Sequence, residues 1–186
     1  GDDNTEARPL IIWVHGGHFI GGSKEELDGL ALTSALRGFV SSTISYRLLN
    51  IFSGVPDTSA LYDVVAKSTH DIRNAVQFFI ADARGQNTYR IDTNQIYLGG
   101  VSAGSIAVIH TAYLDAGDNI PASIAAGFAK NGGFDGAPNV RKYIKGVINL
   151  SGAILNPDIM DADEPALYSF HGSDDATVPI GQGFVG

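Results

Sequence analysis

Short apolar runs alternate with longer amphipathic stretches along this chain. Five runs have the length and composition of strands: residues 10–14, 39–46, 96–98, 143–150 and 166–170. Between them, apolar residues recur at intervals of three and four residues over 24–37 and 58–83, and this spacing predicts helices. The order of strands and helices predicts an α/β fold, with a mostly parallel sheet covered by helices on both faces.

The longest predicted helix, residues 58–83, should have one apolar face. We expect that face to consist of Leu61, Val64, Val65, Ile72, Val76, Phe79 and Ile80. His70 is expected to be partly exposed on the same helix. Residues 51–57 contain Gly and Pro and predict a loop before the helix, and residues 92–95 predict a turn that leads into the strand at 96–98.

The composition is that of a globular protein. The chain has 186 residues, 44% of them hydrophobic, which is enough for one sizeable core, and we expect residues 1–186 to form a single domain. A net charge of −8 disfavours nucleic acids and anionic membrane surfaces as partners, because their phosphates would be repelled. No apolar run approaches the roughly 20 residues that span a bilayer. The chain has no cysteine, which excludes disulfides and a thiolate nucleophile and leaves the compartment open, secretion and the periplasm included.

The segment Gly100-Val101-Ser102-Ala103-Gly104 joins the predicted strand at 96–98 to an apolar helical stretch. Gly-x-Ser-x-Gly at a strand–helix junction is typical of a nucleophilic serine on a sharp, strained turn. Glycine is needed at positions 100 and 104 because a Cβ there would collide with the neighbouring strand and helix. The sequence therefore predicts Ser102 as a nucleophile. The alternative is an ordinary turn rich in Gly and Ser.

A second motif, His15-Gly16-Gly17-His18-Phe19, directly follows the buried strand at 10–14. Glycine lets the backbone approach a substrate closely and aim free N–H groups at a developing oxyanion. We expect the N–H groups of Gly17 and His18, together with that of Ala103, to form an oxyanion hole. The alternative is a plain glycine turn between a strand and a helix.

Four segments occur in the order, and at the intervals, of one enzyme family. They are His15–Phe19, Ser45-Tyr46-Arg47, Gly100–Gly104 and His171-Gly172-Ser173-Asp174-Asp175-Ala176-Thr177-Val178-Pro179. On these motifs the chain resembles α/β-hydrolases of the esterase/lipase type, close to the carboxylesterases and the hormone-sensitive-lipase-like enzymes. The resemblance covers nearly the whole chain. It implies the α/β-hydrolase fold, with Ser102 as the nucleophile of a catalytic triad.

Two adjacent aspartates, Asp174 and Asp175, compete for the acid of that triad. In the family the acid lies on the turn after a late strand, three residues before a Val-Pro pair, and this selects Asp175. The order of serine before acid agrees with the α/β-hydrolase order. Asp175 would orient an imidazole and stabilise its cation. Asp174 would then be a solvated turn residue or a helix cap.

None of the five histidines occupies the position at which the family carries its catalytic base, which lies after one further strand. The family uses His15 structurally, and His18 occupies a variable position after the glycines. His110 lies a little over two turns along the helix behind Ser102, so its ring should point away from the hydroxyl. His171 should pack or hydrogen-bond locally.

The family also has two or more strands before the His-Gly-Gly segment, whereas only residues 1–9 precede the first strand here. We therefore expect a fold truncated at both ends, with the first strands and the histidine-bearing C-terminal segment outside residues 1–186. Such a domain would expose strand edges and apolar surface on which helices normally dock. The alternative is a minimal hydrolase that is completed by self-association.

The resemblance implies acyl transfer to Ser102 from a small carboxylic ester, with no metal and no organic cofactor. Residues 115–140 and 151–164 would form either a small cap over the serine or solvated loops. Acidic side chains within 158–164 lack the spacing of a calcium loop. Four residues are candidates for an acyl pocket, although each fits an ordinary core equally well: Phe19, Phe134, Ile154 and Leu155. A peptidase or amidase on the same fold, and a non-catalytic scaffold, are the alternative functions.

Overall fold

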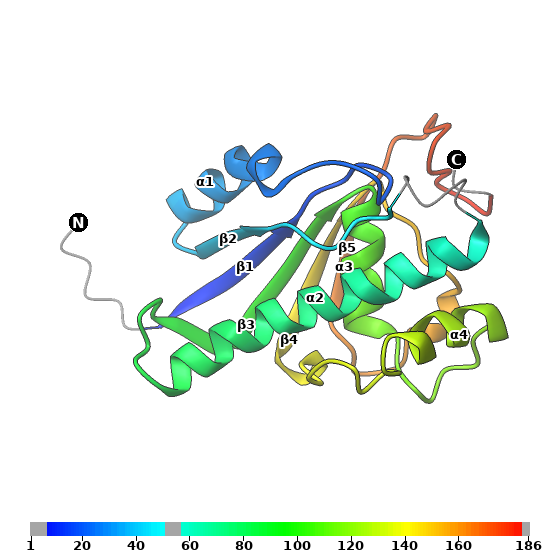
Figure 1. The fold of residues 1–186 in the computed structure, drawn as a ribbon. Coiled ribbons are helices and arrows are strands. Elements are labelled where there is room, and N and C mark those ends of the chain that lie inside the picture. Colours follow the sequence, from blue (N-terminus) through cyan, green and yellow to red (C-terminus); the bar gives the residue numbers. More distant parts are fainter. Residues whose placement is uncertain (1–6, 51–56, 184–186) are drawn as a thin grey trace.

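The computed structural model describes residues 7–50 and 57–183, and its centre is a parallel sheet of five strands in the order β2-β1-β3-β4-β5. The strands are β1 (Arg8–Val14), β2 (Val40–Ile44), β3 (Ile91–Val101), β4 (Ile144–Leu150) and β5 (Ala166–Phe170). All five predicted strands are therefore present (Figure 1). The predicted loop at 51–57 lies outside the described residues up to position 56.

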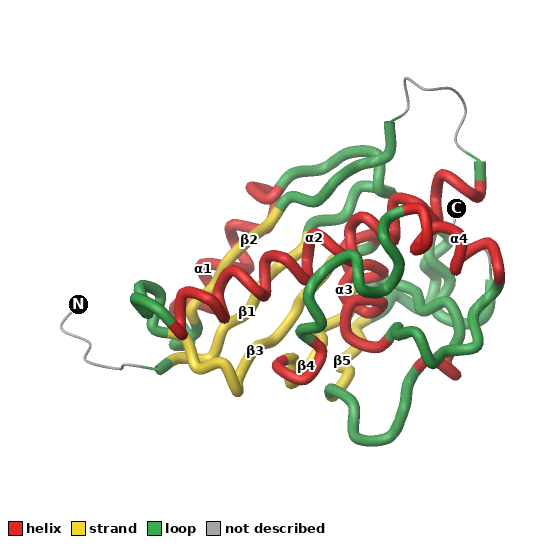
Figure 2. Tube along the Cα trace, turned by 60° about the horizontal axis from the view of Figure 1, so that its bottom comes forward, coloured by secondary structure: helices red, strands yellow, loops and turns green. Residues whose placement is uncertain are grey.

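Helices lie on both faces of the sheet. The α-helices are α1 (Asp28–Leu36), α2 (Thr58–Arg84), α3 (Ala103–Tyr113) and α4 (Ala122–Lys130), and the 3-10 turns are η1 (Lys24–Leu27), η3 (Arg141–Tyr143) and η4 (Pro157–Ile159). Figure 1 shows α2, α3 and α4 on one side of the strands and α1 on the other. Figure 2 shows the strands running side by side, with α2 and α3 lying across them. The predicted helix at 24–37 is thus a 3-10 turn followed by α1.

Alternate residues of each strand face opposite helical layers, because side chains alternate across a sheet. In β1, Leu10, Ile12 and Val14 pack in the large core with α2 and α3. Ile11 and Trp13 face the other way, where Leu27 and the partly buried residues of α1 cover them. Since β1 is buried on both faces, its sequence is a continuous apolar run, as the pattern predicted.

The apolar face of α2 differs from the prediction at two residues. Leu61 is 41% exposed rather than part of the core, and His70 is only 3% exposed rather than partly exposed. The reason is α4, which packs against a different side of the helix. A Cβ added to Gly127 of α4 would lie 2.9 Å from the backbone of Tyr62, and His70 meets Phe128 edge to face at 5.8 Å.

Residues 92–95 are not a turn before β3 but an irregular part of the strand itself. Arg8 pairs with Ile91, and the next paired residues are Leu10 and Ile96, so the register shifts across this stretch. The side chain of Asp92 accepts a hydrogen bond from the backbone N–H of Asn94 at 2.8 Å. The turn chemistry of the sequence is therefore present, but it forms a bulge within a longer strand.

The stretch at 115–140 is not a solvated loop throughout, because it contains α4. Phe128 of this helix is buried in the main core, and Phe134 stacks on it with ring centroids 4.7 Å apart. The helix is therefore part of the core layer beside α2. Phe134 packs in that layer as an ordinary core residue, which was the alternative to a place in an acyl pocket.

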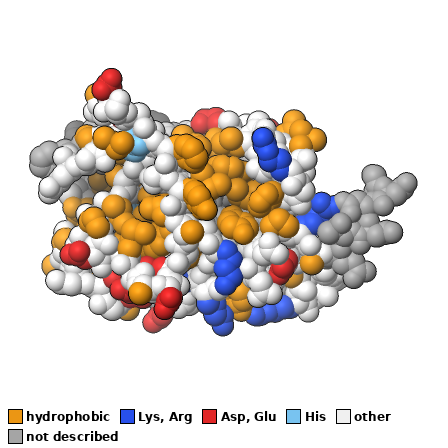
Figure 3. All heavy atoms as spheres, turned by 180° about the vertical axis from the view of Figure 1, so that it is seen from behind, with side chains coloured by type: hydrophobic (Ala, Val, Ile, Leu, Met, Phe, Trp, Pro, Cys, Tyr) orange, Lys and Arg blue, Asp and Glu red, His pale blue; other side chains and the backbone are white. Residues whose placement is uncertain are grey.

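The sheet face that carries α1 exposes apolar side chains beyond that helix. Ile148 and Leu150 of β4 pack against the cluster formed by Ile11, Trp13 and Leu27. They pair in register with Tyr168 and Phe170 of β5. Tyr168 and Phe170 are 64% and 63% exposed. Figure 3, which views this side, shows apolar atoms gathered over it. The expectation of exposed apolar surface is met here by side chains of an edge strand.

Candidate active site

Ser102 lies on the sharp turn between β3 and α3, at the carboxyl end of the sheet. Its backbone has φ 52° and ψ −118°, which is strained for a residue with a side chain. The turn is held by a hydrogen bond from its N–H to the Leu150 carbonyl at 2.8 Å. The side chain is partly exposed and forms no capping hydrogen bond with α3. Its hydroxyl is thus available to a substrate.

Close packing explains the two glycines of the Gly-x-Ser-x-Gly motif. A Cβ on Gly100 would lie 2.5 Å from the carbonyl carbon of Gly104. A Cβ on Gly104 would lie 2.2 Å from the carbonyl oxygen of Val14 and 2.4 Å from that of His15. Both distances are far below van der Waals contact, so only glycine fits. The collisions expected from the sequence are therefore confirmed.

Ser105 supports the turn from below, a role that the sequence reasoning missed. Its hydroxyl donates to the Gly100 carbonyl at 2.5 Å and accepts from the N–H of Leu150 at 2.9 Å. The residue is fully buried. It links the strand before Ser102 to the neighbouring β4. The only signal in the sequence is a small polar residue three positions after Ser102.

The backbone of the His-Gly-Gly segment lies directly against Ser102. A Cβ on Gly16 would be 3.3 Å from the Ser102 Cβ and 3.1 Å from the Val101 carbonyl oxygen. The next three residues all have positive φ: Gly17 at 103°, His18 at 55° and Phe19 at 61°. The Gly17 carbonyl accepts hydrogen bonds from the N–H groups of residues 20 and 21, both at 3.0 Å. A strained, tightly turned backbone therefore borders the serine.

The third predicted oxyanion donor, Ala103, is the first residue of α3. N–H groups in the first turn of a helix have no partner within the helix, and the helix dipole favours negative charge near them. Ser102 is the N-cap residue of this helix. The arrangement therefore places orphan N–H groups and a positive helix end at the serine, which is the chemistry that stabilises an oxyanion.

Tyr46, just after β2, packs against the His-Gly-Gly segment. Its hydroxyl donates to the carbonyl oxygens of His15 at 3.1 Å and Gly16 at 3.3 Å. Its ring stacks on the imidazole of His15, with centroids 4.5 Å apart. Burial raises the pKa of the Tyr46 hydroxyl, which therefore stays protonated as a donor. The sequence reasoning used Tyr46 only as part of a family motif.

Asp175 and Asp174 have different surroundings. One carboxylate oxygen of Asp175 accepts hydrogen bonds from the N–H groups of Thr177 and Val178, both at 2.9 Å. These two bonds, and the nearby His171, lower the pKa of the Asp175 carboxyl. Its second oxygen lies 3.5 Å from His171 Nε2. Asp174 is exposed. The local structure therefore orients Asp175 and leaves Asp174 in solvent.

Most of the histidines are engaged in packing or backbone hydrogen bonds. His15 is fully buried, with Nδ1 at 2.8 Å from the Gly16 carbonyl. His110 is buried, with Nδ1 at 2.7 Å from the Ile106 carbonyl, and Nε2 accepts from the Leu155 N–H at 3.3 Å. His171 Nε2 lies 2.5 Å from the Val178 carbonyl, as expected of a local contact. His70 is buried against α4, and His18 is exposed.

The remaining acyl-pocket candidates lie on both sides of the serine turn in the sequence. Phe19 is buried and meets the ring of Tyr46 edge to face at 5.9 Å. Ile154 is partly buried against the main core, and Leu155 is partly exposed. The hydrogen bond from Leu155 to His110 attaches the segment after β4 to α3. Phe19 therefore supports the His-Gly-Gly segment, while Ile154 and Leu155 stay candidates for contact with a substrate.

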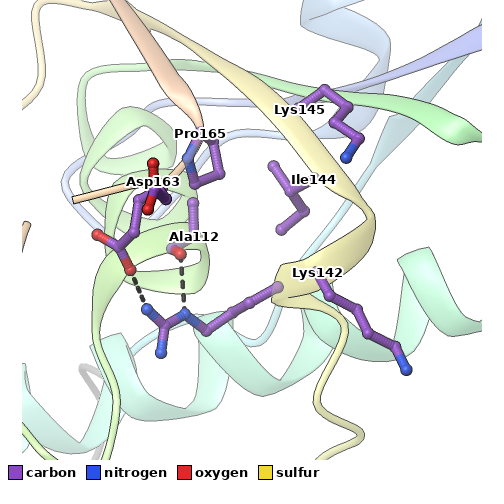
Figure 4. Close-up of a pocket in the computed structure, with 8 residues that line it drawn as sticks. Ala112, Lys142, Ile144, Lys145, Asp163 and Pro165 are labelled. Carbon is purple, nitrogen blue, oxygen red and sulfur yellow. Dashed lines mark hydrogen bonds and ion pairs between the residues drawn. The ribbon is translucent and has the colours of Figure 1, made fainter. Parts of the chain in front are cut away.

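A pocket of about 250 Å³ lies near the amino end of β4, away from the serine turn (Figure 4). Its lining residues are Ala112, Arg141, Lys142, Ile144, Lys145, Asp163, Glu164 and Pro165. The Arg141 guanidinium forms ion pairs with Asp115 and Glu164 and donates to the Ala112 carbonyl at 3.0 Å. Its charge is therefore already paired within the protein. These contacts fasten the 115–118 and 161–165 segments to α3.

Within residues 7–50 and 57–183, the side chains of His, Asp and Glu form no group of three or more that could hold a metal ion. No helix in this described part of the chain combines the length and the hydropathy needed to cross a bilayer.

Comparison with known proteins defines the class to which this fold and site belong. The sequence matches the BD-FAE family over residues 2–154, and the chain therefore belongs to that family. No curated protein gives a significant match. The sheet order, the turn at Ser102 and the similar solved structures together identify the α/β-hydrolase fold.

Two solved structures illustrate the similarity. One is a thermophilic esterase, Est2, from the planctomycete Thermogutta terrifontis, solved with butyrate bound: 17% identity, a TM-score of 0.65, and coverage of 94% of this chain and 65% of that one. The other is MGS-M1, an α/β-hydrolase enzyme from a Medee basin deep-sea metagenome library: 18% identity, a TM-score of 0.62, and coverage of 95% and 60%. The chain thus spans less than two thirds of the length of these enzymes. At such identities the likeness establishes the fold.

Proposed function

We propose that this chain carries the catalytic serine of an esterase that hydrolyses small carboxylic esters. One observation carries the proposal: Ser102 sits in a strained turn at the N-terminus of α3, with the Gly16 backbone packed against it. A free hydroxyl beside orphan N–H groups is the arrangement that acyl transfer requires.

In the proposed mechanism, the Ser102 hydroxyl oxygen attacks the ester carbonyl carbon and its proton passes to a histidine. The N–H groups of Gly17, His18 and Ala103 stabilise the oxyanion of the tetrahedral intermediate. The intermediate collapses to an acyl-enzyme, and the alcohol leaves with the proton from the histidine. Water then attacks the acyl-enzyme by the same route, releasing the acid and restoring the serine. No step calls for a metal or an organic cofactor.

Asp175 is proposed to orient that histidine and to stabilise its cation. Two backbone N–H groups hold one oxygen of its carboxylate, and the other oxygen, which lies 3.5 Å from His171 Nε2, would accept from the catalytic imidazole. We do not assign that role to His15, His110 or His171. The ring nitrogens of His110, and Nε2 of His171, already contact backbone groups, and His15 is fully buried.

The similar solved structures support small acyl groups and a reactive serine. Est2 of Thermogutta terrifontis has been solved with butyrate bound and phosphorylated by paraoxon. The second of these matches the chain at 18% identity with a TM-score of 0.63, and covers 94% of this chain and 63% of that one. We therefore take butyrate esters as the first substrates to test.

The test is hydrolysis of p-nitrophenyl butyrate by the purified chain, with and without added imidazole. Imidazole in solution can stand in for a histidine that the chain does not supply. We expect a rate that depends on imidazole and that is lost in Ser102→Ala. The Ser102→Ala variant also measures hydrolysis by imidazole alone, which must be subtracted. The p-nitroanilide of butyric acid is tested in parallel. Hydrolysis of the ester but not of the anilide would indicate an esterase rather than a peptidase.

A matched control is Ser151→Ala, since Ser151 also has a positive φ, 55°, at the end of a strand, but does not lie in the Gly-x-Ser-x-Gly turn. This variant should keep the imidazole-dependent rate. Equal rates for the unmodified chain and Ser102→Ala under both conditions would contradict the proposal and favour a non-catalytic scaffold.

A further inference from the structure

The segment 45–49 holds the chain between residues 15 and 24 at three points. Tyr46 donates to the carbonyls of His15 and Gly16, at the start of the His-Gly-Gly segment. The N–H of Lys24, beyond the end of that segment, donates to the Ser45 hydroxyl at 3.2 Å. The N–H of Leu49 donates to the Phe19 carbonyl at 2.7 Å. The backbone from residue 15 to residue 24 therefore takes its shape from a part of the chain that is distant in sequence.

The segment 45–49 is itself fixed to α2. The backbone N–H of Arg47 donates to the Asp71 carboxylate at 2.9 Å, and the Arg47 Nε donates to the same group at 2.9 Å. Tyr46 is thus held between a rigid helix and the His-Gly-Gly segment. Only 5% of its surface is exposed, so its hydroxyl has little freedom to turn toward water.

The hydroxyl of Tyr46 acts on the peptide unit that carries a predicted oxyanion donor. The Gly16 carbonyl and the Gly17 N–H belong to one planar, trans peptide, so they point in opposite directions. Fixing the carbonyl therefore fixes the direction of the N–H. The Gly16 carbonyl receives hydrogen bonds from Tyr46 at 3.3 Å and from His15 Nδ1 at 2.8 Å.

Gly22 also packs closely against the Gly16 carbonyl. A Cβ on Gly22 would lie 2.7 Å from the Gly16 carbonyl oxygen and 2.5 Å from His15 Nδ1, and its φ is 92°. The same hydroxyl of Tyr46 also reaches the His15 carbonyl, which shares a peptide with the N–H of Gly16. The Tyr46 hydroxyl therefore contacts the carbonyls of both peptides, His15–Gly16 and Gly16–Gly17.

We infer that Tyr46 is a positioning residue of the oxyanion hole: its hydroxyl, with His15, orients the Gly16–Gly17 peptide so that the Gly17 N–H points at the oxyanion. The inference rests on the proposed function of Ser102. Three consecutive residues with positive φ follow this peptide. Without the Tyr46 hydroxyl, the His15 carbonyl would lose its side-chain donor and the Gly16 carbonyl would keep only His15 Nδ1, so this strained backbone would be held less firmly.

The test is Tyr46→Phe, which keeps the ring that stacks on His15 and removes only the hydroxyl. Loss of one oxyanion donor costs on the order of a hundredfold or more in kcat, and a misdirected donor should cost part of that. We expect kcat for p-nitrophenyl butyrate with imidazole to fall about tenfold, with KM changed less than about twofold. An alkylboronic acid, which adds to the serine as a tetrahedral anion, should bind about tenfold more weakly.

Tyr113→Phe is the matched control. Tyr113 is also buried, and its hydroxyl donates to a carbonyl, that of Pro165, at 2.8 Å. It lies at the far end of α3 from Ser102. Both variants should lower the midpoint of thermal unfolding by similar amounts, but only Tyr46→Phe should change kcat and boronate affinity. Each rate is divided by the concentration of protein whose Ser102 reacts with paraoxon. Unfolded protein is then not counted as enzyme.

A second measurement uses the unmodified chain and does not depend on the variant folding. The Tyr46 hydroxyl proton, held between two carbonyls, should give a slowly exchanging NMR resonance that shifts when the boronic acid binds. A Ser102-dependent rate that is the same in Tyr46→Phe, or a boronate complex that leaves the hydroxyl resonance unmoved, would overturn the inference alone. Activity that persists in Ser102→Ala would overturn the proposed function as well.

Discussion

At the scale of single residues, hydrogen bonding separates two aspartates that are adjacent in sequence. Asp175 receives two backbone N–H groups from its own turn, which fixes the carboxylate and lowers its pKa. Asp174 is exposed. A carboxylate that orients an imidazole must itself be held in place and ionised. The choice of Asp175, which the sequence made by family resemblance, thus has an independent physical argument and stays a prediction.

Replacing each aspartate in turn tests this choice. Asp175→Asn should lower the imidazole-dependent esterase rate of this chain about tenfold or more, because the imidazole loses its orienting charge. Asp174→Asn should change the rate by less than about twofold. Steady-state hydrolysis of p-nitrophenyl butyrate measures both. A larger loss in Asp174→Asn than in Asp175→Asn would reverse the assignment.

Two residues that support the serine turn could not be predicted from their residue type. Ser105 and Tyr46 both hydrogen-bond to backbone groups that border Ser102. Neither residue type is diagnostic, because serine and tyrosine are common in cores and loops. Their importance comes from partners that are distant in the sequence: Leu150, for example, lies 45 positions after Ser105.

At the scale of elements, the unit formed by β3, the serine turn and α3 depends on close approach to β1. The Gly104 Cα lies where a Cβ would overlap the carbonyls of Val14 and His15. The same contact brings the start of the His-Gly-Gly segment to the serine turn. This glycine contact therefore contributes both to stability and to the geometry of the site.

A pair of glycine substitutions separates this contact from ordinary helix propensity. Gly104→Ala should lower the free energy of unfolding by about 2 kcal/mol, because overpacking forces the backbone to move. Gly29 in α1 has nothing within 4 Å of an added Cβ, so Gly29→Ala should raise stability by about 0.5–1 kcal/mol. Urea unfolding followed by circular dichroism measures both. A Gly104→Ala variant as stable as the unmodified chain would contradict the packing argument.

At the scale of the whole molecule, two buried histidines join layers of the fold. His70 of α2 contacts Phe128 of α4, and His110 of α3 accepts a hydrogen bond from Leu155 after β4. Burial lowers the pKa of both imidazoles, so both are neutral in the folded protein where an unfolded chain would begin to protonate them. Acid should therefore loosen the contacts of α4 and of the segment after β4.

The pH dependence of stability follows from these shifts. Between the lowered pKa values and about 6.5, the unfolded state binds more protons, so the free energy of unfolding falls as the pH drops below about 6.5. Each histidine contributes at most about 1.4 kcal/mol per pH unit. Aspartates with lowered pKa values, such as Asp63 and Asp115, lose their contribution only at lower pH.

Urea unfolding between pH 7.5 and 5 measures this slope. The double variant His70→Gln/His110→Gln should have a flatter slope than the unmodified chain, and each single variant should fall between them. Glutamine keeps a donor and an acceptor at each position, so most of the packing is retained. An unchanged slope in the double variant would mean that other groups govern the acid sensitivity.

Local patterns in the sequence are enough to predict the parallel α/β architecture and the tight turn at Ser102. Both depend on short stretches of sequence. Buried strands are continuous apolar runs, and the Gly100–Gly104 turn needs glycine at fixed spacing. Helix α2 was predicted to within one residue at its C-terminal end, because its start and its periodicity are local features. Local physics sufficed for these elements.

Packing between elements determines which side chains are buried and which contact the backbone around Ser102. Helix α4 packs on α2 and so buries His70 while leaving Leu61 exposed. The hydroxyl of Tyr46 finds its partners 30 and 31 residues away. Such contacts join elements that are brought together only when the whole core packs. No local sequence pattern predicts them.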